Sequence, residues 1–260
     1  MTAPILVTGG TGTLGRLVVA RLRDKGCDVR VLSRSPHTDR DGVRFVQGNL
    51  DTGEGVDAAL EGVETVVHCA GSPKGDDVKA RNVVAAAAHA GVDHLVHISV
   101  VGADRVPLRS AADRAMFGYF GAKRGAEDAV RGSAVPYTML RATQFHDLVL
   151  TVARAMAKLP VVPSPSGFRV QPVDAGEVAD RLTELALGDP AGLVPDLGGP
   201  RVYPLADLIR GYLKATGRRR PLLPLRLPGA AAAAFRDGAN LTPDHATGHR
   251  TWEEFLAETH

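Results

Sequence analysis

The chain has 260 residues, of which 44% are hydrophobic and 23% charged, the composition of one soluble globular domain or of a domain with a small lobe. This composition excludes intrinsic disorder and collagen-like repeats. Because 31 basic residues against 29 acidic ones leave a net charge of only +2, the overall balance predicts neither a nucleic-acid partner nor an anionic membrane partner. No apolar run approaches the roughly 20 residues of a membrane span and no secretory leader is recognisable, so we expect a cytoplasmic protein.

Over the first 175 residues, short β-branched segments alternate with longer segments whose apolar residues recur every three or four positions. This alternation predicts an α/β fold with a doubly wound parallel sheet. The strands are expected at Ile5–Thr8, Asp28–Leu32, Val43–Val46, Thr65–His68, His94–Ile98 and Tyr137–Leu140. Apolar stripes at 14–22 and 78–87 predict helices that follow the first and fourth of these strands.

Proline becomes frequent after residue 161, and Gly198-Gly199-Pro200 is the strongest turn signal in this part of the chain. Helices are still expected at about 174–187 and 204–216, with shorter ones at 230–235 and around Trp252 and Phe255. We therefore predict a small C-terminal lobe, placed over the carboxyl ends of the strands, where open α/β sheets bind their ligands.

A glycine-rich segment joins the first predicted strand to the helix after it, with the spacing Gly9-x-x-Gly12-x-x-Gly15. Gly9 permits the turn, Gly12 lets backbone N–H groups approach a pyrophosphate at the positive helix end, and Gly15 allows helix and strand to pack closely. The segment predicts a dinucleotide site, with contacts from Thr8, Gly9, Gly12, Thr13, Leu14 and Gly15. Residues 1–160 are thus predicted to form a dinucleotide-binding Rossmann domain, and residues 161–260 a small substrate-binding lobe from which some segments return to the first domain.

The segment Thr8–Gly15 resembles the fingerprint of the extended and atypical short-chain dehydrogenase/reductases, and the whole chain resembles their NmrA-like group. The resemblance rests on the order of four further segments, Arg81–Ala87 with Gly91-Val92, His97–Gly102, Tyr119–Lys123 and Pro136–Arg141. It implies a Rossmann fold that binds NAD(P). Many members of this group have no assigned substrate, so the resemblance defines the cofactor more closely than the reaction.

The end of the second predicted strand distinguishes NAD from NADP, because an acidic side chain there binds the ribose 2′-hydroxyl and repels a 2′-phosphate. This chain has Ser33-Arg34-Ser35 at that position, which favours NADP(H). NAD(H) remains the alternative, since Arg34 could stack on the adenine or point into solvent with either cofactor. The resemblance implies further cofactor contacts at Asn49, Leu50, Ala70, Gly71, Ser99 and Lys123.

The resemblance also implies a catalytic set of Ser99, Tyr119 and Lys123. Tyr119 and Lys123 are four residues apart at the start of a predicted helix, so both side chains project from one face. A phenol has an ordinary pKa of about 10, and an adjacent ammonium lowers that pKa toward neutrality by favouring the phenolate. Tyr119 would be the acid/base, Lys123 its modulator and Ser99 the hydrogen-bond donor to the substrate oxygen. The alternative is a ring of Tyr119 packed on the cofactor with Lys123 binding only ribose, because NmrA-like relatives often keep just the lysine or neither residue.

Glycines at 118, 121 and 125 weaken the helix that carries this pair, and their spacing predicts close approach of the cofactor or of another helix. After the sixth predicted strand, relatives line the substrate pocket at the positions of Gln144, Phe145 and His146. A helix N-cap at Thr143 with Phe145 in the core would explain the same residues.

Two other patterns are assigned no ligand. The histidines His89, His94 and His97 lack the carboxylate partner and spacing of a metal site, so no metal is expected. The run Arg218-Arg219-Arg220 is interpreted as a solvated helix C-terminus, because no aromatic residues alternate with it as nucleic-acid stacking would require.

The function predicted from these residues is that of an NADP(H)-dependent oxidoreductase that transfers hydride between nicotinamide and a carbonyl, quinone or enone of a small apolar molecule. One alternative is a non-catalytic NAD(P)-binding redox sensor of the NmrA type, and another is an atypical tailoring enzyme that oxidises an aromatic polyketide. The expected partner is a small-molecule substrate, without nucleic acid or membrane, and a homodimer is left open.

Overall fold

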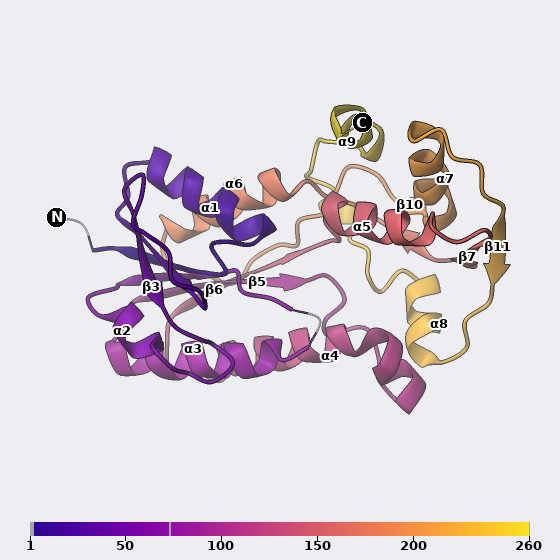
Figure 1. Ribbon diagram of the computed structural model, residues 1–260. Helices are drawn as coiled ribbons and strands as arrows, with labels where there is room; N and C mark the ends of the chain where they lie inside the picture. The colour runs from indigo at the N-terminus through magenta and orange to yellow at the C-terminus, as the bar shows by residue number, and fades with distance from the viewer. Residues whose placement is uncertain (1–2, 73, 260) are drawn as a thin grey trace. The chain divides into compact units, whose positions relative to one another are not determined.

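The computed structural model describes residues 3–72 and 74–259, which fold into two compact units (Figure 1). The first unit comprises Met1–Ser99, Gly121–Arg141 and Gly176–Pro195, and the second comprises Val100–Phe120, Ala142–Ala175 and Asp196–His260. This division differs from the boundary predicted at residue 160. The segment from Gly176 to Pro195 belongs to the first unit because its strand completes the sheet of that unit.

The first unit is built on a seven-stranded sheet in the order β3-β2-β1-β4-β5-β6-β9. The strands are β1 (Ile5–Thr8), β2 (Val29–Ser33), β3 (Val43–Gln47), β4 (Thr65–His68), β5 (His94–Val100), β6 (Tyr137–Ala142) and β9 (Gly192–Leu193). The pairs β3–β2, β2–β1, β1–β4, β4–β5 and β6–β9 are parallel. This order is that of a Rossmann sheet, so the predicted fold class is confirmed.

Helices cover both faces of this sheet, with α1 (Thr13–Asp24) and α6 (Ala175–Ala186) on one face and α2 (Val56–Leu60), α3 (Asp76–Ala90) and α4 (Ala111–Arg131) on the other (Figure 1). On the second face, Leu6, Val66 and Leu95 of adjacent strands pack against Val83 of α3 and Val130 of α4. Strands buried on both faces must be apolar throughout, which is why they read as short continuous β-branched runs.

The second unit contains short elements, and those of its helices that the apolar spacing predicts are present. The elements of this unit are α5 (His146–Met156), β7 (Val162–Pro165), β8 (Arg169–Val170), β10 (Tyr203–Pro204), α7 (Leu205–Ala215), β11 (Leu222–Leu225), α8 (Ala230–Arg236), the 3₁₀ turn η1 (Pro243–His245) and α9 (Trp252–Thr259). Of these, α7, α8 and α9 are the predicted helices. Strands β8 and β10 pair antiparallel, and β7 and β11 pair parallel. Trp252 is buried, and its indole N–H donates to the Leu208 carbonyl, which ties α9 to α7.

Several strand boundaries differ from the predicted ones by one or two residues, and two boundary differences affect candidate site residues. Helix α4 begins at Ala111, so Tyr119 lies in its middle and not at its start. Strand β5 extends to Val100, which leaves Ser99 inside the strand. Within residues 3–72 and 74–259, none of the helices is both long and apolar enough to span a bilayer.

Candidate functional site

The glycine-rich turn between β1 and α1 lies in the first unit and is closed by its own backbone. The Gly12 N–H donates to the Gly9 carbonyl at 2.9 Å, and Gly9 has a φ of +69° that favours glycine. A Cβ on Gly15 would lie 2.1 Å from the Gly9 oxygen, so only glycine fits where the helix passes over the turn. The first turn of α1 carries no acidic residue, which keeps its positive end available to an anion.

Arg34 follows the last residue of β2, at the same edge of the sheet as the glycine turn. Its side chain is exposed and forms no ion pair within the described residues, whereas Ser33 before it is buried. The guanidinium is therefore not committed to an internal carboxylate, as a residue that binds a 2′-phosphate would require.

Lys123 of α4 reaches the loop after β4. Its Nζ lies 3.0 Å from Oδ2 of Asp76, and the two side chains are only 7% and 2% exposed. A Cβ added to Gly71 would lie 3.4 Å from this Nζ, so the backbone at Gly71 passes directly beside the ammonium. The structure therefore brings together Lys123 and Gly71, which the sequence analysis assigned to cofactor binding. It also places the carboxylate of Asp76 beside Lys123.

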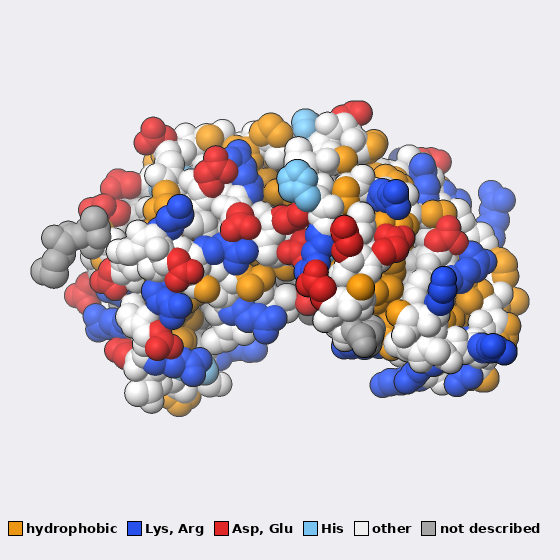
Figure 2. Space-filling model, turned by 90° about the horizontal axis from the view of Figure 1, so that it is seen from above, with side chains coloured by type: hydrophobic (Ala, Val, Ile, Leu, Met, Phe, Trp, Pro, Cys, Tyr) orange, Lys and Arg blue, Asp and Glu red, His pale blue; other side chains and the backbone are white. Residues whose placement is uncertain are grey.

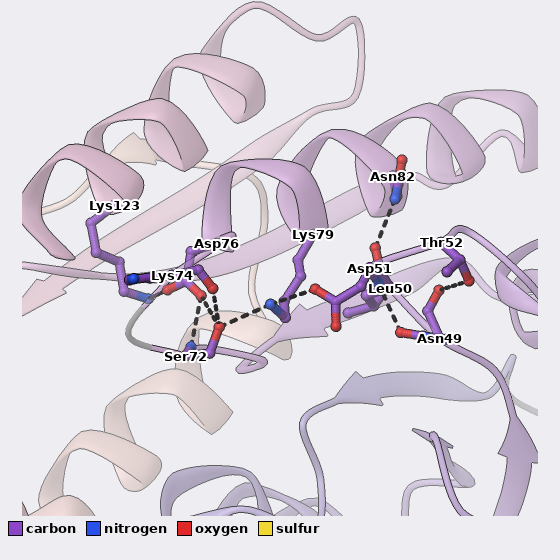
Figure 3. Close-up of polar contacts among 10 residues, drawn as sticks. All are labelled: Asn49, Leu50, Asp51, Thr52, Ser72, Lys74, Asp76, Lys79, Asn82 and Lys123. Carbon is purple, nitrogen blue, oxygen red and sulfur yellow. Dashed lines mark hydrogen bonds and ion pairs between the residues drawn. The ribbon is translucent and has the colours of Figure 1, made fainter. Parts of the chain in front are cut away.

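The same carboxylate organises the loop. Oδ1 of Asp76 accepts hydrogen bonds from the Ser72 N–H at 2.7 Å and from the Ser72 hydroxyl at 3.2 Å. Lys79 Nζ donates to Ser72 Oγ at 2.9 Å and pairs with Asp51 at 2.7 Å (Figure 3). Asn49 Oδ1 accepts the Asp51 N–H at 2.9 Å. A continuous chain of polar contacts therefore joins the loop after β3 to Lys123.

Ser99 contacts a buried ion pair. Its hydroxyl donates to Oε1 of Glu127 at 2.7 Å, and the guanidinium of Arg141 binds both carboxylate oxygens at 2.8 and 2.6 Å. Glu127 is fully buried, while Arg131, on the next turn of α4, adds a contact at 3.1 Å from a partly exposed position. Glu127 follows Lys123 by one helical turn, so α4 presents an ammonium and a carboxylate to the same face of the sheet.

Thr8 lies beside two stacked histidines under the glycine turn. Its hydroxyl accepts the Ala70 N–H at 3.4 Å and lies 2.7 Å from Nδ1 of His68. Burial, reinforced by Lys123, lowers the pKa of His68 to about 3, and burial lowers the pKa of His97 well below its ordinary value. Both imidazoles are thus neutral near pH 7, and Thr8 and His68 share one hydrogen bond whose direction depends on the histidine tautomer.

Tyr119 and the predicted substrate residues belong to the second unit, whereas Ser99 and Lys123 belong to the first. The Tyr119 ring packs edge-on against Phe120 at 5.6 Å. The side-chain amide of Gln144 is buried without a hydrogen-bond partner in the described part of the chain, and Phe145 is the N-cap of α5. The predicted N-cap at Thr143 is therefore wrong by two residues.

His146 occupies the core of the second unit. It is fully buried, with its ring stacked on Phe255 at 4.9 Å and on Trp252 at 6.0 Å. Burial lowers the pKa of His146 to about 4, so the ring is neutral near pH 7. Both ring nitrogens of His146 lack a hydrogen-bond partner in the described part of the chain, as the amide of Gln144 does, so the substrate contacts at Gln144, Phe145 and His146 stay predictions.

Residues 9–186 of this chain match the sequence pattern of the NAD(P)H-binding family. The chain belongs to this family. A relative from Streptomyces griseus, (4-alkanoyl-5-oxo-2,5-dihydrofuran-3-yl)methyl phosphate reductase, is 37% identical over 182 residues, which cover 67% of this chain and 61% of the relative. The aligned part thus spans less than two thirds of that relative.

Two solved structures have the same fold as this NAD(P)H-binding chain. The NADPH-dependent quinone oxidoreductase of Escherichia coli in complex with NADPH has a TM-score of 0.80, with 21% identity over 98% of this chain and 99% of that one. The triphenylmethane reductase of Citrobacter sp. in complex with NADP(H) has a TM-score of 0.76, with 20% identity over 98% and 99%. At these identities the likeness establishes the fold.

Family membership confirms the predicted NAD(P) class of cofactor. The glycine turn fits such a cofactor, because the close backbone packing at Gly15 and the helix start without acidic residues suit the binding of a pyrophosphate. Sequence reasoning missed Asp76 and Glu127. Each had a local signal, because Asp76 follows Gly75 at a helix start and Glu127 lies four residues after Lys123.

Proposed function

We propose that this NAD(P)H-binding protein is an NADP(H)-dependent oxidoreductase of the NmrA-like group that transfers hydride to or from a carbonyl, quinone or enone of a small apolar molecule. The observation that carries the proposal is the position of Lys123, a nearly buried ammonium beside Gly71 in the same unit as the glycine turn. A bound nicotinamide dinucleotide supplies or accepts the hydride. Lys123 would hold ribose hydroxyls, and Asp76 would fix the direction of its ammonium.

Tyr119 is the proposed proton donor and acceptor at the substrate oxygen. It lies one helical turn before Lys123 on α4, a spacing that puts both side chains on one face of the helix. Proton transfer by a positioned side chain contributes about 10²- to 10⁴-fold to a rate. Gln144 is the proposed substrate contact, because its buried amide has hydrogen-bonding capacity that no described residue satisfies.

The substrate class is supported by what the relatives are named for. These relatives are named as reductases of a furanone phosphate, a quinone and a triphenylmethane compound. The furanone and the quinone share a carbonyl group conjugated to a carbon–carbon double bond. Such compounds accept hydride at carbon. The substrate proposed for this chain is therefore a conjugated electrophile.

The preference for NADP(H) over NAD(H) is proposed from Arg34, whose exposed guanidinium forms no ion pair within the described residues. Arg34→Asp places a carboxylate where a 2′-phosphate would lie. We expect the ratio of NADPH to NADH affinity to fall at least about tenfold, because a charge pair is replaced by repulsion. Equal titration curves for wild type and variant with each nucleotide would contradict the preference.

A second candidate, a non-catalytic redox sensor, is favoured by one observation. The Ser99 hydroxyl donates a hydrogen bond to Glu127, and the Lys123 ammonium pairs with Asp76. Two members of the proposed catalytic set therefore already have buried partners. A sensor needs only the nucleotide site.

The two candidates are separated by fluorescence titration with NADPH and NADH, followed by NADPH oxidation with a panel of quinones, enones and ketones. Wild type is compared with Tyr119→Phe and with the matched control Tyr137→Phe, which lies on β6. Turnover reduced about 100-fold or more in Tyr119→Phe alone, with NADPH affinity kept, supports the oxidoreductase. Tight NADPH binding without oxidation on any compound favours the sensor.

A further inference from the structure

Two segments of the second unit contain basic residues and no acidic residue. Residues 148–173 and 208–227 together hold nine cations but none of the chain's 29 aspartates and glutamates. The nine are Arg154, Lys158, Arg169, Arg210, Lys214, Arg218, Arg219, Arg220 and Arg226, and all are exposed. The net charge of +2 therefore conceals a strongly basic region.

Few direct ion pairs involve the nine cations of this basic region. Arg210 pairs with Asp207 at 2.6 Å, and the other eight cations form no ion pair within residues 3–72 and 74–259. A shallow groove of about 780 Å³ lies between the end of α7 and the start of β11, and Lys214, Arg218 and Arg220 are among its lining residues. Figure 2 shows Lys and Arg side chains around hydrophobic ones at the right-hand end of the view, the end where β11 lies in Figure 1.

The hydrophobic side chains among these cations come from the outward face of the β7–β11 sheet. Val162 of β7 is buried in the core, and in the parallel register it lies beside Leu222, which packs on the same core. Because side chains alternate along a strand, the next residues face outward. Leu223 and Leu225 are accordingly 51% and 39% exposed, and Val161, just before β7, is 43% exposed.

We propose that this outward face, with the cations around it, docks the protein on an anionic lipid surface. Exposed leucines enter the interfacial region of a bilayer, while arginine and lysine bind the headgroup phosphates around them. The protein would bind to the surface of the bilayer and would not span it. The proposal does not depend on the proposed reductase activity. It replaces the expectation, drawn from the net charge, that the protein has no membrane partner.

The residues of this face disfavour the other occupants. A second copy that added a strand would meet Pro163, Pro165 and Pro224, which lack the N–H groups that such pairing uses. A second copy docked face to face would bring two strongly basic regions together. Single-stranded nucleic acid would use exposed aromatic rings for stacking, but Phe168 and Tyr212, the aromatic residues of the two segments, are buried.

The test is co-sedimentation of the full chain with vesicles of phosphatidylcholine alone or with about 30% phosphatidylglycerol, at low and physiological salt. One variant combines Arg218→Gln, Arg219→Gln and Arg220→Gln, and its matched control combines the same change at the exposed Arg23, Arg44 and Arg124 of the first unit. A second variant combines Leu223→Ser and Leu225→Ser. Circular dichroism checks that each variant is folded.

We expect binding to the anionic vesicles only, weakened about 100-fold or more by the basic triple variant, weakened by the leucine variant and unchanged by the control. Equal binding to both vesicle types, or none, would overturn the proposal. So would a leucine variant that binds anionic vesicles like wild type, because the face would then act as a general polyanion site. Light scattering that shows a dimer abolished by the leucine variant would assign the face to a second copy instead.

Discussion

The buried pair of Glu127 and Arg141 gives the sharpest test of what holds the first unit together. Glu127→Gln keeps the volume and one acceptor but removes the negative charge that faces the buried guanidinium of Arg141. Removing one partner of a buried pair costs about 3–5 kcal/mol. With a urea m-value of roughly 3 kcal/mol/M, the midpoint of unfolding should fall by about 1 to 1.7 M.

The assay is urea unfolding at pH 7, followed by far-ultraviolet circular dichroism and by the fluorescence of Trp252. Trp252 is the single tryptophan and lies in the second unit, so its signal separates unfolding of that unit from the signal of the whole chain. The double variant Glu127→Gln with Arg141→Met removes both charges and should recover most of the lost stability.

The matched control is Arg131→Gln, which removes the partly exposed cation from the same carboxylate and should cost less than about 1 kcal/mol. A Glu127→Gln cost below that of the control, or a double variant as unstable as the two single changes added together, would refute the interpretation of Glu127 as the counter-charge of Arg141.

Three further changes test the site and its surroundings. Gly15→Ala forces a methyl group against the Gly9 carbonyl and should weaken NADPH binding at least about tenfold, whereas Gly118→Ala, where a Cβ meets nothing within 4 Å, should leave binding unchanged and add up to about 1 kcal/mol of stability. Ser99→Ala removes a hydrogen bond to a buried carboxylate and should cost about 1.5–3 kcal/mol in the same urea assay, while a variant as stable as wild type would contradict the contact. His146 has a folded pKa of about 4 against 6.5 when unfolded, so the unfolded state binds more protons between these values and stability falls by about 3 kcal/mol from pH 6.5 to pH 4 through this group. Unfolding curves of wild type and His146→Phe at pH 7 and pH 5 check this, and equal pH dependence would contradict it.

The fold of the first unit was predictable because its signals are local. A strand buried on both faces must be apolar throughout, and the glycine turn between Thr8 and Gly15 has few alternative conformations. The close helix approach predicted from the glycines of α4 is present at Gly125, where a Cβ would lie 2.9 Å from Cβ of Asp77, and absent at Gly118. Spacing alone does not distinguish the two, because only the packing of α3 against α4 decides which glycine meets a neighbour.

The polar partners were not predictable from the sequence, because they join residues far apart in the chain. Lys123 and Asp76 are 47 positions apart and lie on different helices, so nothing local indicates their pairing. The ring packing of His146 was not predictable either, because the rings that bury it come from α9, more than 100 residues later. The start of α4 was missed because Asp113 accepts hydrogen bonds from the N–H groups of Ser110 and of the distant Ala231, and periodicity does not show these contacts.

Under the proposed function, the structural contact of Ser99 competes with its proposed catalytic role. A serine hydroxyl carries one proton, and here that proton is donated to Glu127, so the same hydroxyl does not donate to a substrate oxygen at the same time. In the proposed reaction, either Tyr119 stabilises the developing charge or Ser99 leaves the carboxylate in every turnover. Because Glu127 keeps Arg141 when Ser99 leaves, the second course costs one hydrogen bond and not the buried ion pair. The network thus leaves Ser99 available at a modest cost, while Lys123 stays oriented by Asp76 in either case.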